Sequence, residues 1–264
     1  MTIKLIAADM DGTLLDSNDN LSPYLFDLVK KLQNNNIKFV VASGRQYHNL
    51  LKRFEDIKDD LTYIAENGSV IYEKGQSIYV EEVDTKEMIK ALEEIRQAKD
   101  MFPVFCGVKS AYIENDNEIF LEEANKYYEK LEMVDDLLSV LERDKICKMA
   151  IYDLNDAETG AYKLLEKYKE NILICLSGKH WVDFMNPKVN KGEAIKILQE
   201  NYNISYDETM AFGDYLNDYE MMQSCKYSYA MDNAHPNLKE ICNYRAKSND
   251  EDGVVDAIKM HFEL

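Results

Sequence analysis

The stretch that decides the fold is IKLIAADMDGT, which occupies residues 3–13. Its first six residues form a nearly continuous apolar run, which is typical of a strand buried on both faces of a parallel sheet. Asp9 and Asp11 follow directly, and residues two apart on an extended segment face the same way. Ligands of open α/β sheets bind beyond the carboxyl ends of the strands, so this stretch predicts a functional site. The alternative interpretation is a turn in which the two aspartates only cap backbone N–H groups.

Buried strands and amphipathic helices alternate on both sides of this stretch. A helix is predicted to begin with Ser22 as its N-cap and Pro23 as its first residue, and strands follow at residues 37–42 and 63–65. The same alternation returns from residue 191 to the end of the chain. Strands that alternate with helices predict βαβ units and a parallel sheet.

The segment between these two parts has a different pattern. It contains strand patterns joined by short turns, together with helices predicted at residues 85–99 and 157–168. This pattern is typical of an antiparallel α+β module. We therefore predict an α/β protein, with a Rossmann-like parallel-sheet core formed by residues 1–82 and 187–264 and an inserted α+β domain at residues 83–186.

The composition indicates an acidic globular protein. The 264 residues include 31 Lys and Arg against 49 Asp and Glu, which is a formal net charge of −18. Such a surface repels nucleic acids and anionic membranes, so we expect neither as a partner. No stretch approaches the ~20 apolar residues of a membrane span, and the N-terminal apolar run is too short for a signal peptide. Five cysteines without a CxxC pair favour reduced thiols and a cytoplasmic protein.

A second acidic segment, GDYLND at residues 213–218, follows the strand predicted at residues 209–212. Asp214 and Asp218 add two carboxylates, and Asn217 adds an amide that can donate to an oxyanion. Carboxylates gathered at two strand ends need a counter-charge, and a hard divalent cation such as Mg²⁺ prefers oxygen ligands of this kind. The alternative is a capped start of a helix.

Three smaller features add groups suited to an anion. Ser43-Gly44-Arg45 follows the predicted strand at residues 37–42 and supplies a hydroxyl, a flexible N–H and a cation. Lys191 opens a predicted helix, where the macrodipole disfavours a cation and therefore suggests that it serves an anion. Gly12 permits a tight turn that brings backbone N–H groups close to an anion. The alternatives are a loop serine and a solvated lysine.

In combination, these segments resemble the haloacid dehalogenase superfamily, and specifically its Cof-type phosphatases with a large α/β cap of type IIB. The four motifs stand in the family order: DMDGT at 9–13, SGR at 43–45, KG at 191–192 and GDYLND at 213–218. Three further segments are similar to that subfamily: ENG at 66–68, AMDNA at 230–234 and EDGV at 251–254. One departure is Asp232, where the subfamily pattern suggests a small residue.

The resemblance implies a phosphatase that works through an aspartyl-phosphate. Asp9 is the implied nucleophile, and Asp11 is the implied acid that protonates the leaving oxygen and then activates water. The implied cofactor is Mg²⁺, held by Asp9, by Asp11 through its main-chain carbonyl, and by Asp214, with Asp218 bracing the site. The groups implied to bind the phosphoryl oxygens are the side chains of Ser43, Lys191 and Asn217 and the backbone at Met10, Gly12 and Gly44.

In this family the inserted cap selects the leaving group, so the resemblance implies a small phosphorylated metabolite as substrate, with a sugar phosphate as the default. Candidates for specificity are Arg45, Asn67, His180 and Trp181. Each is also interpretable as a surface or packing residue. For Trp181, its place in a predicted strand favours the interpretation as a core residue. Flavin mononucleotide and pyridoxal phosphate stay open as substrates.

Three other functions stay open. A phosphomutase or other phosphotransferase keeps Asp9 and Asp11 but passes the phosphoryl group to a sugar. A receiver-like signalling module is phosphorylated without turnover, although the inserted domain and Asp11 argue against it. A non-catalytic protein that binds a phosphorylated ligand is disfavoured because all four motifs are intact. The sequence predicts no particular oligomeric state.

Overall fold

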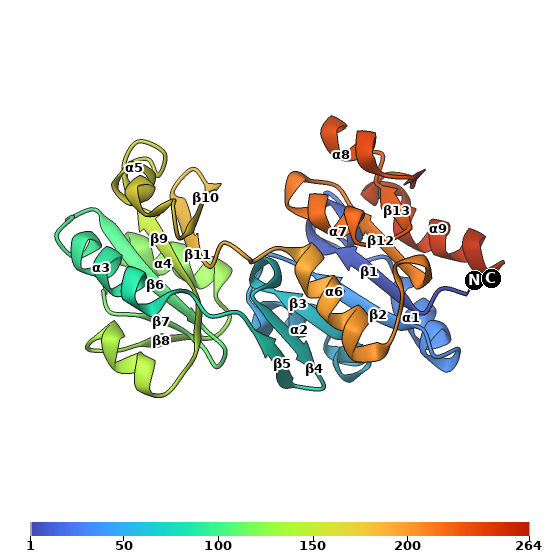
Figure 1. The fold of residues 1–264 in the computed structure, drawn as a ribbon, viewed down its shortest axis with the longest axis horizontal. Helices are drawn as coiled ribbons and strands as arrows, with labels where there is room; N and C mark the ends of the chain where they lie inside the picture. The colour runs from blue at the N-terminus through green and yellow to red at the C-terminus, as the bar shows by residue number, and fades with distance from the viewer. Residues whose placement is uncertain (1, 264) are drawn as a thin grey trace. The chain divides into compact units, whose positions relative to one another are not determined.

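A computed structural model describes residues 2–263, and its contacts divide the chain into two compact units (Figure 1). Unit 1 comprises the chain up to Gly44, Phe54–Ile78, and the chain from Asn190 onward. Unit 2 comprises Arg45–Arg53 and Tyr79–Val189. Unit 2 is therefore formed by two insertions into unit 1, one short and one long.

Unit 1 is built on a sheet of eight strands in the order β14-β13-β12-β1-β2-β3-β4-β5. The strands are β1 (Leu5–Asp9), β2 (Lys38–Ala42), β3 (Thr62–Ala65), β4 (Val70–Glu73), β5 (Gln76–Val80), β12 (Thr209–Gly213), β13 (Tyr227–Ala230) and β14 (Tyr244–Arg245). β1 lies between β2 and β12, runs parallel to both, and is buried at all five residues. The predicted α/β class with a parallel-sheet core is confirmed.

The register of the central strands brings four strand ends to one edge of the sheet. Ala8 of β1 pairs with Val41 of β2 and with Phe212 of β12. Ala42 of β2 in turn pairs with Ile64 of β3. Because all these pairs are parallel, the segments that follow β1, β2, β3 and β12 leave the sheet at the same edge.

The helices of unit 1 are α1 (Leu25–Asn34), α6 (Lys191–Tyr202), α7 (Tyr219–Gln223), α8 (Pro236–Ile241) and α9 (Gly253–Phe262). α1 begins two residues after the predicted start at Pro23, because Ser22 forms a turn rather than a cap. The Ser22 side chain accepts a hydrogen bond from the Tyr24 N–H, and its carbonyl accepts one from the Leu25 N–H.

Unit 2 has a six-stranded sheet in the order β10-β11-β9-β6-β7-β8, with only the β7–β8 pair parallel among the described pairs. The strands are β6 (Met101–Gly107), β7 (Ala111–Ile113), β8 (Leu131–Met133), β9 (Ile146–Asp153), β10 (Leu173–Gly178) and β11 (Trp181–Met185). The helices are α2 (Tyr47–Arg53), α3 (Thr85–Ile95), α4 (Glu118–Tyr127) and α5 (Ala161–Leu165). Apolar side chains of α3 and α5 form one core with residues of β9 and β11.

The helix predicted at residues 157–168 is shorter in the structure, where α5 begins only at Ala161. The buried carboxylate of Asp153 sets this start, since its Oδ2 accepts a hydrogen bond from the Ala161 N–H at 2.9 Å. Gly160 lies so close that a Cβ there would be 2.0 Å from the same oxygen. A tertiary contact therefore overrides the helical spacing of the sequence.

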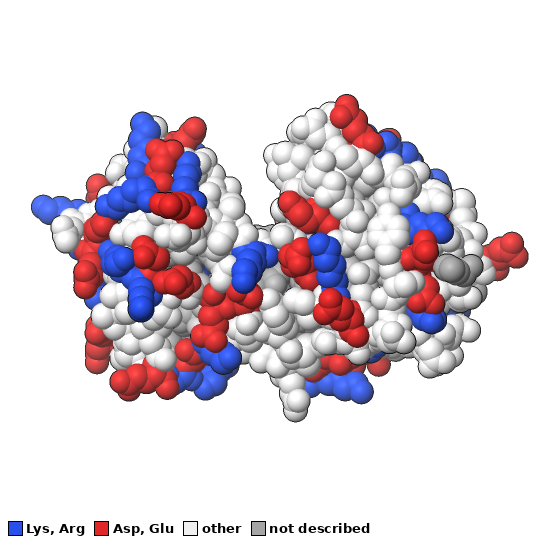
Figure 2. All heavy atoms as spheres, viewed as in Figure 1, with Lys and Arg blue, Asp and Glu red and all other residues white. Residues whose placement is uncertain are grey.

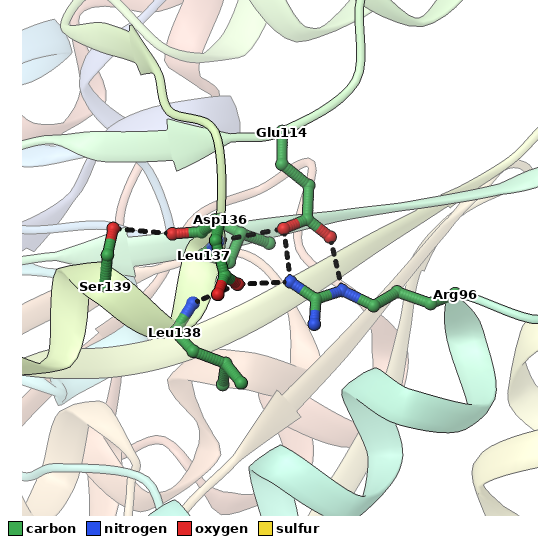
Figure 3. Close-up of polar contacts among 6 residues, drawn as sticks. All are labelled: Arg96, Glu114, Asp136, Leu137, Leu138 and Ser139. Atoms are coloured by element: carbon green, nitrogen blue, oxygen red, sulfur yellow. Dashed lines mark hydrogen bonds and ion pairs between the residues drawn. The ribbon is translucent and has the colours of Figure 1, made fainter.

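Arg96, just after α3, ties three parts of unit 2 together (Figure 3). Its guanidinium donates from Nε and Nη2 to the two carboxylate oxygens of Glu114, at 2.7 and 2.5 Å, and from Nη2 to Asp136 at 2.6 Å. Glu114 and Asp136 also accept backbone N–H groups of Leu137 and Leu138. The network thus joins the end of α3 to the residue after β7 and to the start of the 3-10 helix Leu137–Glu142.

The surface carries both signs of charge. On the face that Figure 2 displays, acidic and basic side chains are interspersed over each unit. Within residues 2–263, no helix has the length and apolar character that a membrane crossing requires.

Candidate active site

Three carboxylates meet at the edge where β1 and β12 end. Asp9 is the last residue of β1, and Asp214 and Asp218 lie in the segment that follows β12. One oxygen of each lies within 4.8 Å of the others. Asp9 and Asp218 are buried, and Asp214 is half-buried. These are hard oxygen donors with a surplus of negative charge, so the cluster fits a divalent cation such as Mg²⁺.

Asp218 shapes the segment that carries Asp214. Its Oδ2 accepts the backbone N–H groups of Asp214 at 3.1 Å and Tyr215 at 3.3 Å. Both carboxylates are thereby held by local backbone geometry, which explains why the GDYLND spacing places them together. The capped helix start that the sequence offered as an alternative is present together with the acidic cluster, since the 3-10 helix Leu216–Asp218 leads directly into α7.

The turn after β1 fits closely against Asp214. Gly12 has φ +74°, and a Cβ there would lie 2.4 Å from Asp214 Oδ2, so both the conformation and the space demand glycine. Thr13 Oγ1 donates to Asp214 Oδ1 at 3.2 Å, and Asn233 Nδ2 donates to the Gly12 carbonyl at 2.7 Å. Asp11 is exposed in this turn, whereas Asp9 is buried.

Lys191 lies inside the carboxylate cluster. It is the first residue of α6 and is fully buried, and its Nζ donates to Asp9 Oδ1 at 2.5 Å and to Asp218 Oδ1 at 2.6 Å. Burial by itself lowers the pKa of Lys191, but the charges of Asp218 and Asp9 outweigh it and raise this pKa above its usual value. Lys191 is therefore a permanent cation at the site.

One ammonium does not balance three carboxylates. Burial, and next the charge of Asp218, raise the pKa of Asp9 well above its usual value, although Lys191 acts in the opposite direction. Burial and Asp218 also raise the pKa of Asp214 to about 6. Asp9 and Asp214 thus hold protons more tightly than free carboxylates, which is the behaviour of a site that lacks positive charge.

A second group of polar residues lies at the ends of β2 and β3. Ser43 is fully buried, and its carbonyl accepts the Asn67 N–H at 3.0 Å. Gly44 lies against the Asn67 side chain, and Asn217 Nδ2 donates to Asn67 Oδ1 at 3.3 Å. Met10, between Asp9 and Asp11, is fully buried. The structure therefore brings Ser43, Gly44, Asn67 and Asn217 together in unit 1.

The other specificity candidates lie in unit 2. Arg45 donates to Asn49 Oδ1 at 3.2 Å, and His180 Nδ1 lies 2.9 Å from the Asp153 carbonyl. Trp181 is 8% exposed and packs on an aromatic group, with its ring centroid 5.0 Å from that of Tyr152. Trp181 is thus packed within unit 2 and His180 is half-buried, and a role of either residue in specificity stays a prediction.

Sequence reasoning missed Thr13 and Asn233 as supports of the site. Thr13 closes the DMDGT motif, and a hydroxyl beside two aspartates was a signal that it serves one of the acidic side chains. Asn233 stands in the AMDNA segment, but its contact with the Gly12 carbonyl spans 221 residues of sequence and has no local signal.

Comparisons with known proteins agree with this architecture. The family model for haloacid dehalogenase-like hydrolases matches residues 6–258. The chain is 30% identical over 261 residues to 5-amino-6-(5-phospho-D-ribitylamino)uracil phosphatase YbjI of Escherichia coli (strain K12), covering 98% of this chain and 96% of the relative. A Bacillus subtilis (strain 168) phosphatase named for the same substrate, YwtE, is 26% identical, with 96% of each chain covered.

Among solved structures, SMU.1108c from Streptococcus mutans UA159 superposes with a TM-score of 0.84 at 32% identity, and the match covers 100% of both chains. The family match spans nearly the whole sequence and includes every motif of the site. Curated relatives that match over nearly their full length are phosphatases. The chain therefore belongs to the haloacid dehalogenase-like hydrolases and is a phosphatase.

Proposed function

We propose that the protein hydrolyses a small phosphorylated metabolite with Mg²⁺ and through an aspartyl-phosphate at Asp9. The observation that carries this proposal is the buried arrangement of Asp9, Asp214, Asp218 and Lys191 at the end of β1. Asp9, Asp214 and the Asp11 carbonyl would hold the ion, with Asp218 behind them. Bound there, Mg²⁺ supplies positive charge to the carboxylates and to the phosphoryl oxygens.

The reaction proposed for the chain's own residues has two steps. The Asp9 carboxylate attacks phosphorus, the bond to the ester oxygen breaks, and Asp11 gives its proton to that leaving oxygen. Asp11 then takes a proton from a water molecule, which attacks the aspartyl-phosphate and releases inorganic phosphate and free Asp9. Lys191 supports both steps because its bond to Asp9 Oδ1 fixes the rotation of the nucleophile.

Neutral groups would orient the phosphoryl oxygens. The Ser43 hydroxyl, the N–H groups at Met10, Gly12 and Gly44 and the amide of Asn217 are the proposed donors, together with Lys191. Donors aimed at the charge that develops in the transition state are a major source of catalysis. Ser43 and Gly44 follow β2 and Asn217 follows β12, which are the two strands on either side of β1, and this position supports the role.

For the substrate, we propose a sugar or sugar-alcohol phosphate. The support is the pair of relatives named for a 5-phospho-D-ribitylamino compound, which carries its phosphate on a ribityl chain. The domain that selects it is proposed to be the inserted residues 83–186. We also infer a cytoplasmic location, and the five free cysteines support it because thiols persist in a reducing compartment.

The test is phosphate release from a panel of esters: p-nitrophenyl phosphate, sugar phosphates, the ribityl compound, flavin mononucleotide and pyridoxal phosphate. We expect release with Mg²⁺, none with EDTA, and none from Asp9→Asn. Asp56→Asn, an exposed carboxylate in the turn Glu55–Asp60, is the matched control and should keep full activity. Appreciable turnover by Asp9→Asn contradicts the mechanism, and an isomer formed without free phosphate would indicate a phosphomutase.

A further inference from the structure

The turn after β3 has an unusual backbone. Glu66, Asn67 and Gly68 follow one another with φ of +49°, +57° and +109°. L-residues rarely adopt this left-handed region, and asparagine tolerates it better than most. Such a run persists only where surrounding contacts impose it, and it is common at functional sites.

The contacts that impose it come from two segments of the proposed phosphate site, the one after β2 and the one after β12. The Asn67 N–H donates to the Ser43 carbonyl at 3.0 Å. The Asn67 amide lies across Gly44, where a Cβ would be 2.9 Å from Oδ1 and 3.1 Å from Nδ2. Asn217 Nδ2 donates to the same Oδ1 at 3.3 Å. The turn therefore connects the segment after β2 with the segment after β12.

Gly68 completes this connection on the other side. A Cβ at Gly68 would lie 2.3 Å from the Asn190 carbonyl oxygen and 3.2 Å from the backbone nitrogen of Lys191. The turn thus packs directly on the start of α6, from which Lys191 enters the carboxylate cluster. A shift of the turn would displace Lys191 as well as Ser43 and Asn217.

We infer that Asn67 is a positioning residue that orients Asn217 toward the phosphoryl group, and that it does not recognise the leaving group. Asn217 is exposed and stands on a one-turn element, so its amide would rotate freely without a partner. Asn67 Oδ1 accepts one of its two N–H groups and leaves the other for a phosphoryl oxygen. This inference rests on the phosphate-binding role proposed above for Asn217.

The test separates the backbone of Asn67 from its side chain. Asn67→Gly retains the left-handed conformation and removes only the amide, so we expect an unchanged or higher melting temperature. We expect roughly a three- to tenfold loss in kcat/KM and in affinity for inorganic phosphate with Mg²⁺, as for one hydrogen bond. In an Asn217→Ala background the same substitution should change neither quantity.

The outcomes distinguish the interpretations. Full activity of Asn67→Gly would mean that only the backbone of this residue matters. If Asn67→Gly lowers kcat/KM and phosphate affinity equally in wild type and in Asn217→Ala, Asn67 acts through another residue. Either result overturns the inference. Altered preference among esters with unchanged phosphate affinity would assign Asn67 to the leaving group, which also overturns it. If the wild type binds phosphate but cleaves no ester, the phosphatase mechanism fails while the affinity cycle still decides the role of Asn67. Wild type that binds no phosphate overturns both.

Gly44→Ala provides a second, independent variant. Its Cβ would push the Asn67 amide away, because a side-chain end moves more easily than the backbone around it. We expect a loss similar to that of Asn67→Gly, and little further loss when the two are combined. The inference is overturned if Gly44→Ala is as active as wild type. It is also overturned if Gly44→Ala causes the same loss of activity in the Asn67→Gly protein as it causes in the wild type.

Discussion

Replacing Lys191 by methionine tests the charge balance of the site most directly. Methionine has nearly the same shape, so the substitution removes the ammonium and preserves the packing. It leaves Asp9, Asp214 and Asp218 with oxygens within 4.8 Å of one another and no cation between them. Removing one partner of a buried ion pair costs ~3–5 kcal/mol. Protonation of Asp9 or Asp214 relieves part of this repulsion, so we expect a loss near ~3 kcal/mol.

The matched control lies on the same helix. Lys196 pairs with Glu193 at 2.6 Å, but the two side chains are 54% and 50% exposed. An exposed pair of this kind contributes about 0–1 kcal/mol, so Lys196→Met should be nearly neutral. The assay is urea unfolding at pH 7.5 in EDTA, in which the midpoint and slope yield the free energy of unfolding.

Added Mg²⁺ provides the refuting comparison. An ion that binds among the carboxylates replaces the missing positive charge, so it should stabilise Lys191→Met more than wild type and reduce the difference between them. If Lys191→Met loses no more stability than Lys196→Met, or if its deficit is the same with and without Mg²⁺, the electrostatic explanation of the site is wrong.

Three further predictions follow from the same structure. Asp11→Asn should release one equivalent of p-nitrophenolate in a rapid burst, because that leaving group needs no proton, and stopped-flow absorbance measures the burst. Its steady-state turnover should then be ~10²–10⁴-fold slower than that of wild type, because hydrolysis of the aspartyl-phosphate needs a base. Arg96→Met should destabilise unit 2 by ~2–3 kcal/mol, since charge-assisted bonds are lost, whereas Arg143→Met, on an exposed pair, should have little effect in urea unfolding. Lys4, and next the Ser205 backbone, lower the pKa of Glu208 to about 2, so the contribution of this carboxylate to stability is complete above pH ~4.5 and disappears as the pH falls toward 2. In acid unfolding, the free energy of unfolding of Glu208→Gln should therefore change less between pH ~4.5 and 2 than that of wild type.

The fold was predictable where burial leaves a direct mark on the sequence. Strands β1, β2 and β12 lie inside a parallel sheet, and this is why they read as apolar runs followed by polar residues. The rule that ligands bind at the carboxyl ends of such strands then placed the acidic motifs at one edge. Local pattern and topology agree here, so the site could be located before its geometry was known.

Elements that depend on distant partners were not predictable. The sequence indicated no helix at α2, and Gln46, just before it, is tied to the longer segment of unit 2 through two hydrogen bonds with the Lys130 backbone. The pairing of β3 with β4 was also missed, because four-residue strands provide too little alternation to recognise. In the site, Lys191 and Asp9 are 182 residues apart, and only the folded chain shows that the lysine serves carboxylates.

The charges of the site indicate different roles for the proposed Mg²⁺ and for the protein's neutral donors. Of the site residues described in unit 1, Lys191 supplies the positive charge, and it is already bound to Asp9 and Asp218. Without a metal, a phosphate dianion would therefore meet a net negative cluster in a protein of formal charge −18. In the proposed mechanism, its attraction would come from Mg²⁺ held by the carboxylates. Neutral donors such as Asn217, held by Asn67, then orient the phosphoryl group and add the modest affinity of single hydrogen bonds, because a directed N–H adds geometry without upsetting the charge balance.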